Sequence, residues 1–231
     1  MGFLAKLAVA LGLARPAAAA GDTPQDETFV RMRAAFPYEI VTVPGSRALA
    51  EWEKLKKRGS GWPVIVGDDE ALGRVLEGYS IDDASVFPVP PDAAYRLPAP
   101  RSVEEILAAA DKIDVPAELQ RLFDEEYGDD PFELPEGEWP APGEASRMTL
   151  TVDRDIMTGK PFERTHILIV PTDDPTQVPA FLRWGGWNAC PAPEVHVAAH
   201  RRWRAQYGAE IVGISSDVIN MRVARRPATR E

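Results

Sequence analysis

The chain has 231 residues, of which 45% are hydrophobic and 27% charged, as is typical of a globular protein. The formal net charge of −10 argues against nonspecific nucleic-acid binding as the main activity. The single cysteine excludes an intrachain disulfide and a zinc site built from several cysteines, and it fits a reducing compartment.

The charge is unevenly distributed along the chain. Residues 181–231 contain eight Arg, no Lys and four acidic residues, which gives this segment a charge of +4. The first 180 residues hold the other 18 basic and 32 acidic residues, and their charge is −14. A basic C-terminal module is therefore expected beside an acidic remainder.

The N-terminus, residues 1–25, has some features of a secretory signal. The basic Lys6 precedes an apolar run over residues 7–14, and an Ala-rich stretch follows, but Arg15 interrupts the pattern. The run is too short to span a membrane. We expect a cytoplasmic protein with a signal-like or disordered N-terminus, and export through this segment is the alternative.

An N-terminal α/β region is predicted over residues 26–122. It begins as a β-α-β-α unit, with strands at 38–43 and 62–66. The predicted helices cover 46–58, with Ser46 as N-cap, and about 68–78. A further helical stretch, 102–122, starts with a capping box formed by Ser102 and Glu105.

An acidic, Pro-rich segment separates this region from the rest of the chain. Residues 123–145 contain nine acidic residues, four Pro and no basic residue. Such a composition buries too little apolar surface to order itself. We therefore predict a linker over residues 123–147 and a C-terminal module over residues 148–231.

The C-terminal module is predicted to be β-rich with one long helix. Strands are expected at 148–152, 165–170 and 178–184, a helix at 191–207, and a hairpin of strands 209–214 and 218–223. Gly208 is the expected end of the helix. The predicted fold class is α+β (mixed α/β), with a mixed sheet and flanking helices.

Residues 181–200 concentrate the side chains that can do chemistry. Trp184, Gly185, Gly186 and Trp187 predict a tight turn with positive φ that brings two indoles together. The turn indicates either an aromatic wall of a ligand pocket or a plug in the core. With Asn188 and His196, these four residues are the predicted ligand-binding set.

Cys190, Asn188 and His196 are candidate catalytic residues. Cysteine, histidine and asparagine are the residue types of a thiol-nucleophile hydrolase, and a helix N-terminus beside Cys190 would favour a thiolate. The one histidine outside the predicted helix at 191–207 is His166. The competing interpretation is a structural cysteine packed under Trp187.

Metal and cofactor motifs are weak. His196 and His200 lie four residues apart, so both could reach one ion with Cys190, yet the His-Glu-x-x-His pattern is missing. His200 is expected on the solvent-side flank of its helix. Asp68 and Asp69 are better explained as helix caps than as metal ligands. Phosphate-loop and dinucleotide motifs are also missing. We predict no metal and no cofactor.

The segment Phe181-Leu-Arg-Trp-Gly-Gly-Trp-Asn-Ala-Cys190-Pro-Ala-Pro-Glu-Val-His196, with the later Tyr207-Gly-Ala-Glu210, resembles the DUF4253 family, a bacterial domain family of unknown function. The resemblance covers about residues 148–231, and residues 61–68 resemble a region upstream of the domain in longer members. Family members continue beyond the position of Glu231 into another helix. The resemblance implies no activity and no catalytic residue.

The predicted function is therefore a non-enzymatic module that binds a small molecule or a protein. An immunity-like role would suit a small acidic bacterial protein, by analogy alone. The alternative is a hydrolase or transferase that uses Cys190 as nucleophile and a histidine as base.

Overall fold

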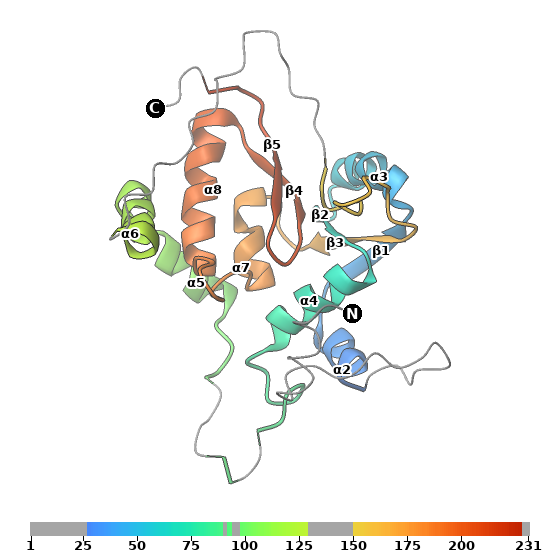
Figure 1. The fold of residues 1–231 in the computed structure, drawn as a ribbon, viewed down its shortest axis with the longest axis horizontal. Coiled ribbons are helices and arrows are strands. Elements are labelled where there is room, and N and C mark those ends of the chain that lie inside the picture. Colours follow the sequence, from blue (N-terminus) through green and yellow to red (C-terminus); the bar gives the residue numbers. More distant parts are fainter. Residues whose placement is uncertain (1–26, 90–91, 94–97, 129–149, 228–231) are drawn as a thin grey trace.

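The computed structural model describes residues 27–89, 92–93, 98–128 and 150–227. The helices are α2 (Glu27–Ala35), α3 (Gly45–Arg58), α4 (Asp69–Ser80), α5 (Val103–Ala110), α6 (Val115–Tyr127), α7 (Val178–Leu182) and α8 (Pro193–Tyr207), with a 3-10 turn η1 (Pro175–Gln177) before α7. The strands are β1 (Glu39–Val43), β2 (Trp62–Gly67), β3 (Thr165–Val170), β4 (Glu210–Ile214) and β5 (Ile219–Arg222). Helices and one mixed sheet confirm the predicted α+β class (Figure 1).

The five strands form a single sheet in the order β1-β3-β2-β4-β5. β3 lies antiparallel between β1 and β2, β2 and β4 run parallel, and β4 and β5 form the predicted antiparallel hairpin. Every residue of β2 and β3 is buried, which requires cover on both faces of these strands. The helices α3 and α4 both contact β2 and β3 and provide cover there.

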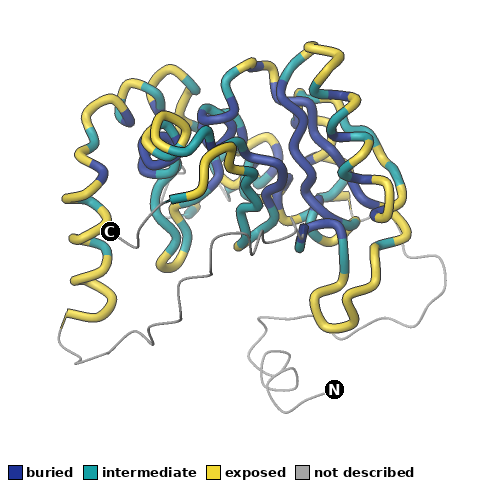
Figure 2. Tube along the Cα trace, turned by 90° about the horizontal axis from the view of Figure 1, so that it is seen from above, coloured by how far each residue is buried: buried dark blue, intermediate teal, exposed yellow. Residues whose placement is uncertain are grey.

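A second group of helices packs around α8. The helices α5, α6 and α7 all contact α8, and η1 joins this group to β4. Figure 2 shows the buried chain concentrated in the sheet and its neighbouring helices, while α6 lies at one end with most of its length exposed. In the part of the chain that the structure describes, no helix is long and apolar enough to cross a membrane.

Local sequence signals account for several helix ends. Asp68 caps α4 by accepting a hydrogen bond from Ala71 N, and Ser102 and Glu105 form the predicted capping box of α5. Gly59 and Gly208 end α3 and α8 in the left-handed conformation. Ser46, however, is not the N-cap of α3. The N-cap is Pro44 and the helix begins at Gly45, whose N–H donates to the carbonyl oxygen of Phe162.

The strand predicted at 178–184 is wrong, because residues 178–182 form α7, which directly follows the η1 turn. Pro179 has no N–H for a strand ladder but fits the first turn of a helix. The Asp174 side chain starts the preceding turn by accepting from Thr176 N. An apolar run of five residues has no clear period, so the sequence pattern alone did not separate strand from helix.

The strand predicted at 148–152 is also wrong for residues 150–152, the part that is described. The backbone N–H groups of Thr151 and Val152 both donate to the side-chain oxygen of Asn220 on β5. The Asn220 side chain thus takes the place of a neighbouring strand as the acceptor for these two backbone N–H groups.

The sheet joins the two halves that the acidic segment separates in the sequence. β1 and β2 come from the region before it, and β3, β4 and β5 from the module after it. β3 pairs with β1 on one side and with β2 on the other, so the halves share one sheet and one core. The first residues of the predicted linker belong to α6, which extends to Tyr127, and residues 129–147 lie outside the described part.

Candidate functional site

The two tryptophans of the Trp-Gly-Gly-Trp turn meet edge to face, as predicted. Their ring centroids are 5.3 Å apart at an interplanar angle of 85°. Trp184 is almost fully buried and donates its indole N–H to the carbonyl oxygen of Ser215, at 2.7 Å. Trp187 is half-buried, and its indole N–H has no acceptor among the described residues. Trp184 is therefore held in place, whereas the Trp187 indole N–H is unpaired within the described part of the chain.

Both glycines of the turn have positive φ, 116° at Gly185 and 85° at Gly186, which confirms the predicted backbone. Gly186 N donates to the carbonyl oxygens of Cys190 and Pro191, at 3.2 and 2.9 Å, and this contact closes the loop between α7 and α8. Asn188 also adopts a left-handed conformation, with φ of 48°, which asparagine tolerates better than most residues.

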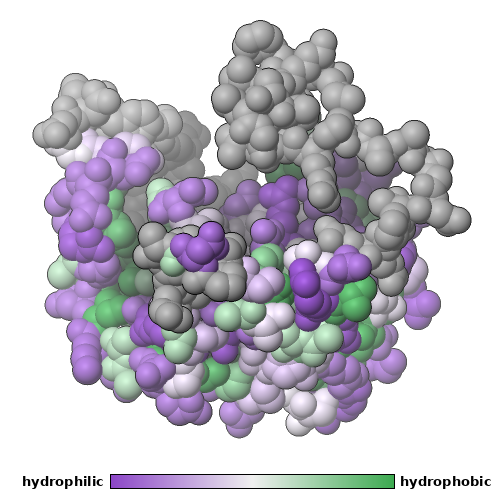
Figure 3. All heavy atoms as spheres, turned by 90° about the horizontal axis from the view of Figure 1, so that it is seen from below, coloured by the Kyte–Doolittle hydropathy of each residue, from purple (hydrophilic) through white to green (hydrophobic). Residues whose placement is uncertain are grey.

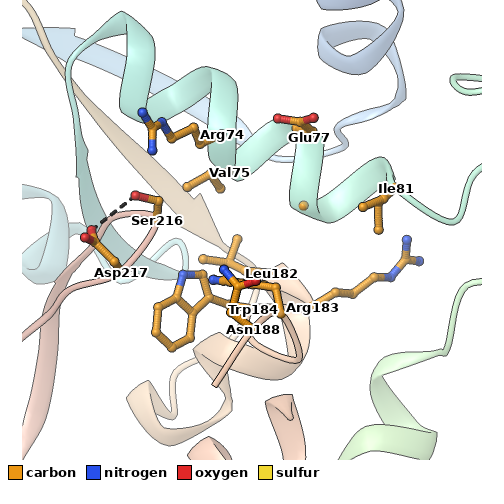
Figure 4. Close-up of a pocket in the computed structure, with 12 residues that line it drawn as sticks. Arg74, Val75, Glu77, Ile81, Leu182, Arg183, Trp184, Asn188, Ser216 and Asp217 are labelled. Carbon is orange, nitrogen blue, oxygen red and sulfur yellow. Dashed lines mark hydrogen bonds between the residues drawn. The ribbon is translucent and has the colours of Figure 1, made fainter. Parts of the chain in front are cut away.

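A cavity of about 490 Å³ lies against this turn. We call it the tryptophan cavity. Three segments line it: α4 with the residue after it, the end of α7 with the following loop, and the β4–β5 turn (Figure 4). The lining residues are Arg74, Val75, Glu77, Gly78, Ile81, Leu182, Arg183, Trp184, Trp187, Asn188, Ser216 and Asp217. This volume is within the range of small-molecule sites, about 300–1,000 Å³.

The cavity combines an apolar wall with charged groups at its edges. Arg183 is held in place, because its guanidinium donates to the carbonyl oxygen of Tyr79, at 3.0 Å, and lies 4.5 Å from the centre of the Tyr79 ring. Arg74 pairs with Glu70 at 2.6 Å and also interacts with Glu77 and Asp217. Glu77 itself has no hydrogen bond or short ion pair among the described residues, so its carboxylate is available to a ligand.

Cys190 and His196 lie near Trp184 but do not line the tryptophan cavity. The His196 ring is 4.7 Å from that of Trp184, and its Nε2 is 3.5 Å from Cys190 Sγ. Burial raises the pKa of the Cys190 thiol, although a hydrogen bond from the Gly186 backbone acts the other way. Burial lowers the pKa of His196 to about 4, against a smaller opposite effect of the Pro191 backbone. A neutral thiol beside a neutral imidazole is favoured at pH 7.

Two details separate this pair from the expected catalytic arrangement. α8 begins at Pro193 with Ala192 as N-cap, so Cys190 precedes the helix N-terminus instead of capping it. Among the described residues, no hydrogen bond joins Asn188 to Cys190 or His196, and Asn188 lines the tryptophan cavity. The geometry assembles a cysteine and a histidine without the third group.

His200 is buried, with 2% of its surface exposed, and not on a solvent-side flank as the sequence suggested. Its ring lies between those of His196 and Trp203, at 6.3 and 5.5 Å, and neither ring nitrogen has a hydrogen-bond partner among the described residues. Burial, and then the neighbouring His196, lower its pKa to about 3. No group of three metal-ligating side chains occurs in the described ranges.

Of the predicted ligand-binding residues, Trp184, Trp187 and Asn188 line the cavity. Gly185, Gly186 and His196 do not line it: the two glycines shape the turn, and His196 packs against the Trp184 ring. The groups that α4 and the β4–β5 turn contribute to the cavity were not predicted from the sequence. Their only sequence signals were the connection between the predicted hairpin strands, where residues 215–217 are Ser-Ser-Asp, and the charged residues of the predicted helix at about 68–78.

Comparison with known families gives one match. Residues 166–231 match DUF4253, described as a domain of unknown function. This confirms the resemblance seen in the sequence for that segment. The DUF4253 match runs from β3 through the Trp-Gly-Gly-Trp turn and α8 to the hairpin, so it includes two of the three segments around the cavity and leaves out α4. No curated protein and no solved structure matched the chain.

Proposed function

We propose that the protein is a non-enzymatic binding protein whose tryptophan cavity takes an apolar group of its ligand, either aromatic or branched aliphatic. The carrying observation is the cavity itself, where Val75, Leu182 and the two indoles form an apolar wall bordered by charged side chains. Mostly apolar concave sites with a few polar groups are the usual form of ligand sites. A partner protein that inserts an apolar side chain into the cavity would be such a ligand, and binding of that kind fits an immunity-like role.

The indole N–H of Trp187, which lines the tryptophan cavity, provides a direct assay of binding. In a titration of ¹⁵N-labelled protein with N-acetylphenylalaninamide, the Trp187 indole signal is expected to shift and saturate. The indoles of Trp52 and Trp62 donate to core carbonyl oxygens, at 2.7 and 2.8 Å, and their signals are expected to stay unchanged. They therefore serve as internal controls for the effect of added compound.

A pair of variants controls for changes in folding. Trp187→Ala lacks the indole signal itself, so its affinity is measured by isothermal titration calorimetry, and it is expected to weaken binding about five- to tenfold, because an aromatic contact contributes about 1 kcal/mol. Trp203→Ala removes a partly buried tryptophan from α8, outside the cavity, and should leave the affinity unchanged. The proposal fails if neither N-acetylphenylalaninamide nor N-acetylleucinamide causes a saturable shift in the unmodified protein.

A second candidate function is a thiol-nucleophile hydrolase or transferase, and the 3.5 Å approach of Cys190 Sγ to His196 Nε2 is the observation in its favour. This function needs a reactive thiolate near neutral pH. The raised pKa of Cys190 and the lowered pKa of His196 both disfavour one. Binding is therefore the better-supported function.

The rate of Cys190 alkylation by iodoacetamide separates the two functions. A raised thiol pKa means that little thiolate is present at pH 7, so labelling of the folded protein should be slower than in urea and should increase as pH rises above 9. His196→Gln should not lower the rate. Fast labelling at pH 7 that is lost in His196→Gln would instead establish the catalytic pair.

A further inference from the structure

A second cavity, of about 390 Å³, lies beside the first. We call it the acidic cavity, and it is found where the parallel strands β2 and β4 end. Gly67 ends β2 and leads into α4, and Ser215 follows β4 at the start of the β4–β5 turn. In open α/β sheets, ligands bind outside the carboxyl ends of the parallel strands. Its position therefore indicates a ligand site.

The two cavities adjoin at a shared set of residues. Arg74, Ser216 and Asp217 line both of them. Figure 4 shows Arg74 on α4 on one side, with Ser216 and Asp217 on the hairpin turn opposite. A ligand that enters the tryptophan cavity can therefore extend past Arg74 into the acidic cavity.

The charges of the acidic cavity do not cancel. Its two cations are already paired, Arg74 with Glu70 at 2.6 Å and Arg154 with Asp153 at 2.8 Å. Three further carboxylates remain, those of Asp68, Asp155 and Asp217. Asp217 interacts with Arg74 at longer range, but none of the three has a short ion pair among the described residues.

Each of these carboxylates is held in place by neutral donors. Asp68 accepts from Ala71 N, at 3.0 Å, and Asp155 accepts from the backbone and hydroxyl of Thr158, at 2.7 and 2.9 Å. Asp217 accepts from the hydroxyls of Ser215 and Ser216, at 3.3 and 3.1 Å. The Thr158 hydrogen bonds lower the pKa of Asp155, so its charge is present at neutral pH. Fixed carboxylates at a cavity favour a cationic group.

On this basis, and resting on the proposed function, we propose that the protein binds a cationic amphipathic ligand. Its apolar group occupies the tryptophan cavity, and its ammonium or guanidinium group reaches the acidic cavity. Adjacent apolar and basic residues of a peptide carry this pair of groups, and so does a free aryl-alkyl amine.

The test compares three capped dipeptides in the same Trp187 indole titration. They differ only in the second side chain, which is positive, neutral or negative: acetyl-Phe-Lys-amide, acetyl-Phe-Gln-amide and acetyl-Phe-Glu-amide. The lysine peptide is expected to bind about fivefold more tightly than the glutamine peptide, and the glutamate peptide more weakly. The preference should shrink as salt is added, because the carboxylates are solvent-accessible. The affinity for 4-phenylbutylamine is compared with that for the lysine peptide, which distinguishes a free amine from a peptide as the source of the apolar and cationic groups.

Asp68→Asn tests the acidic cavity without removing the helix cap, since asparagine is an equally good N-cap. It should reduce the lysine-over-glutamine ratio. Asp114→Asn is the matched control, because Asp114 is the N-cap of α6 and lines neither cavity. Equal affinities for the three peptides would overturn this inference and leave the proposed function standing, whereas no binding by any of them would count against both.

Discussion

At the scale of single residues, Gly185 and Gly186 share a backbone conformation that side chains rarely adopt, yet their surroundings differ. A Cβ on Gly185 would lie 2.2 Å from the carbonyl oxygen of Pro191 and 3.0 Å from the His196 ring, whereas a Cβ on Gly186 would meet nothing within 4 Å. The missing side chain at Gly185 thus allows Pro191, before α8, to approach the turn closely. Gly186 is needed only for its positive φ, because a side chain there would have room.

The two substitutions should therefore differ in cost. Gly186→Ala is expected to lower the free energy of unfolding by about 1–2 kcal/mol, the cost of a left-handed alanine. Gly185→Ala adds the collision with Pro191 and is expected to cost about 3 kcal/mol or more. Urea unfolding of both variants measures the difference. Equal losses would show that the loop shifts freely and that Gly185 does not set its path.

At the scale of elements, the sequence predicts the helices and strands that are determined by residues close to one another in the chain. The strands β1, β2 and β3, the helices α3, α4 and α8 and the terminal hairpin are marked by periodicity, caps and turn residues. The predictions fail where a residue distant in the sequence determines the local structure, or where a short apolar run has no clear period. Residues 150–152 are not a strand, because the Asn220 side chain accepts their N–H groups, and α7 is a helix in a run that reads equally well as a strand.

The candidate site divides in the same way. The sequence alone predicts the Trp184 and Trp187 contact, because four consecutive residues make the turn. Arg74 approaches the turn from α4 and lies 110 residues or more before it in the chain. Asp217 approaches from the hairpin and lies about 30 residues after it. Their convergence follows from the sheet order, which short-range patterns do not contain.

At the scale of the whole molecule, the order of strands decides what can fold separately. β3 and β4, the two inner strands that follow the acidic segment, do not contact each other as neighbours, because β2 lies between them. β2 contributes a fully buried strand to the core, and α4 behind it forms one side of both cavities. The matched segment 166–231 therefore holds only part of a sheet and only part of the site.

Dividing the chain tests this dependence. A fragment of residues 150–231 lacks β2, so β3 and the hairpin of β4 and β5 lose the strand that joins them, and the fragment is expected to unfold without a cooperative transition. A fragment of residues 1–128 supplies β1, β2, α3 and α4. Mixing the two should restore one cooperative transition and the Trp187 response to N-acetylphenylalaninamide. If residues 150–231 alone unfold cooperatively, the C-terminal module is an independent domain and the shared core is not essential to it. Because both cavities need α4, binding should still require the two fragments together.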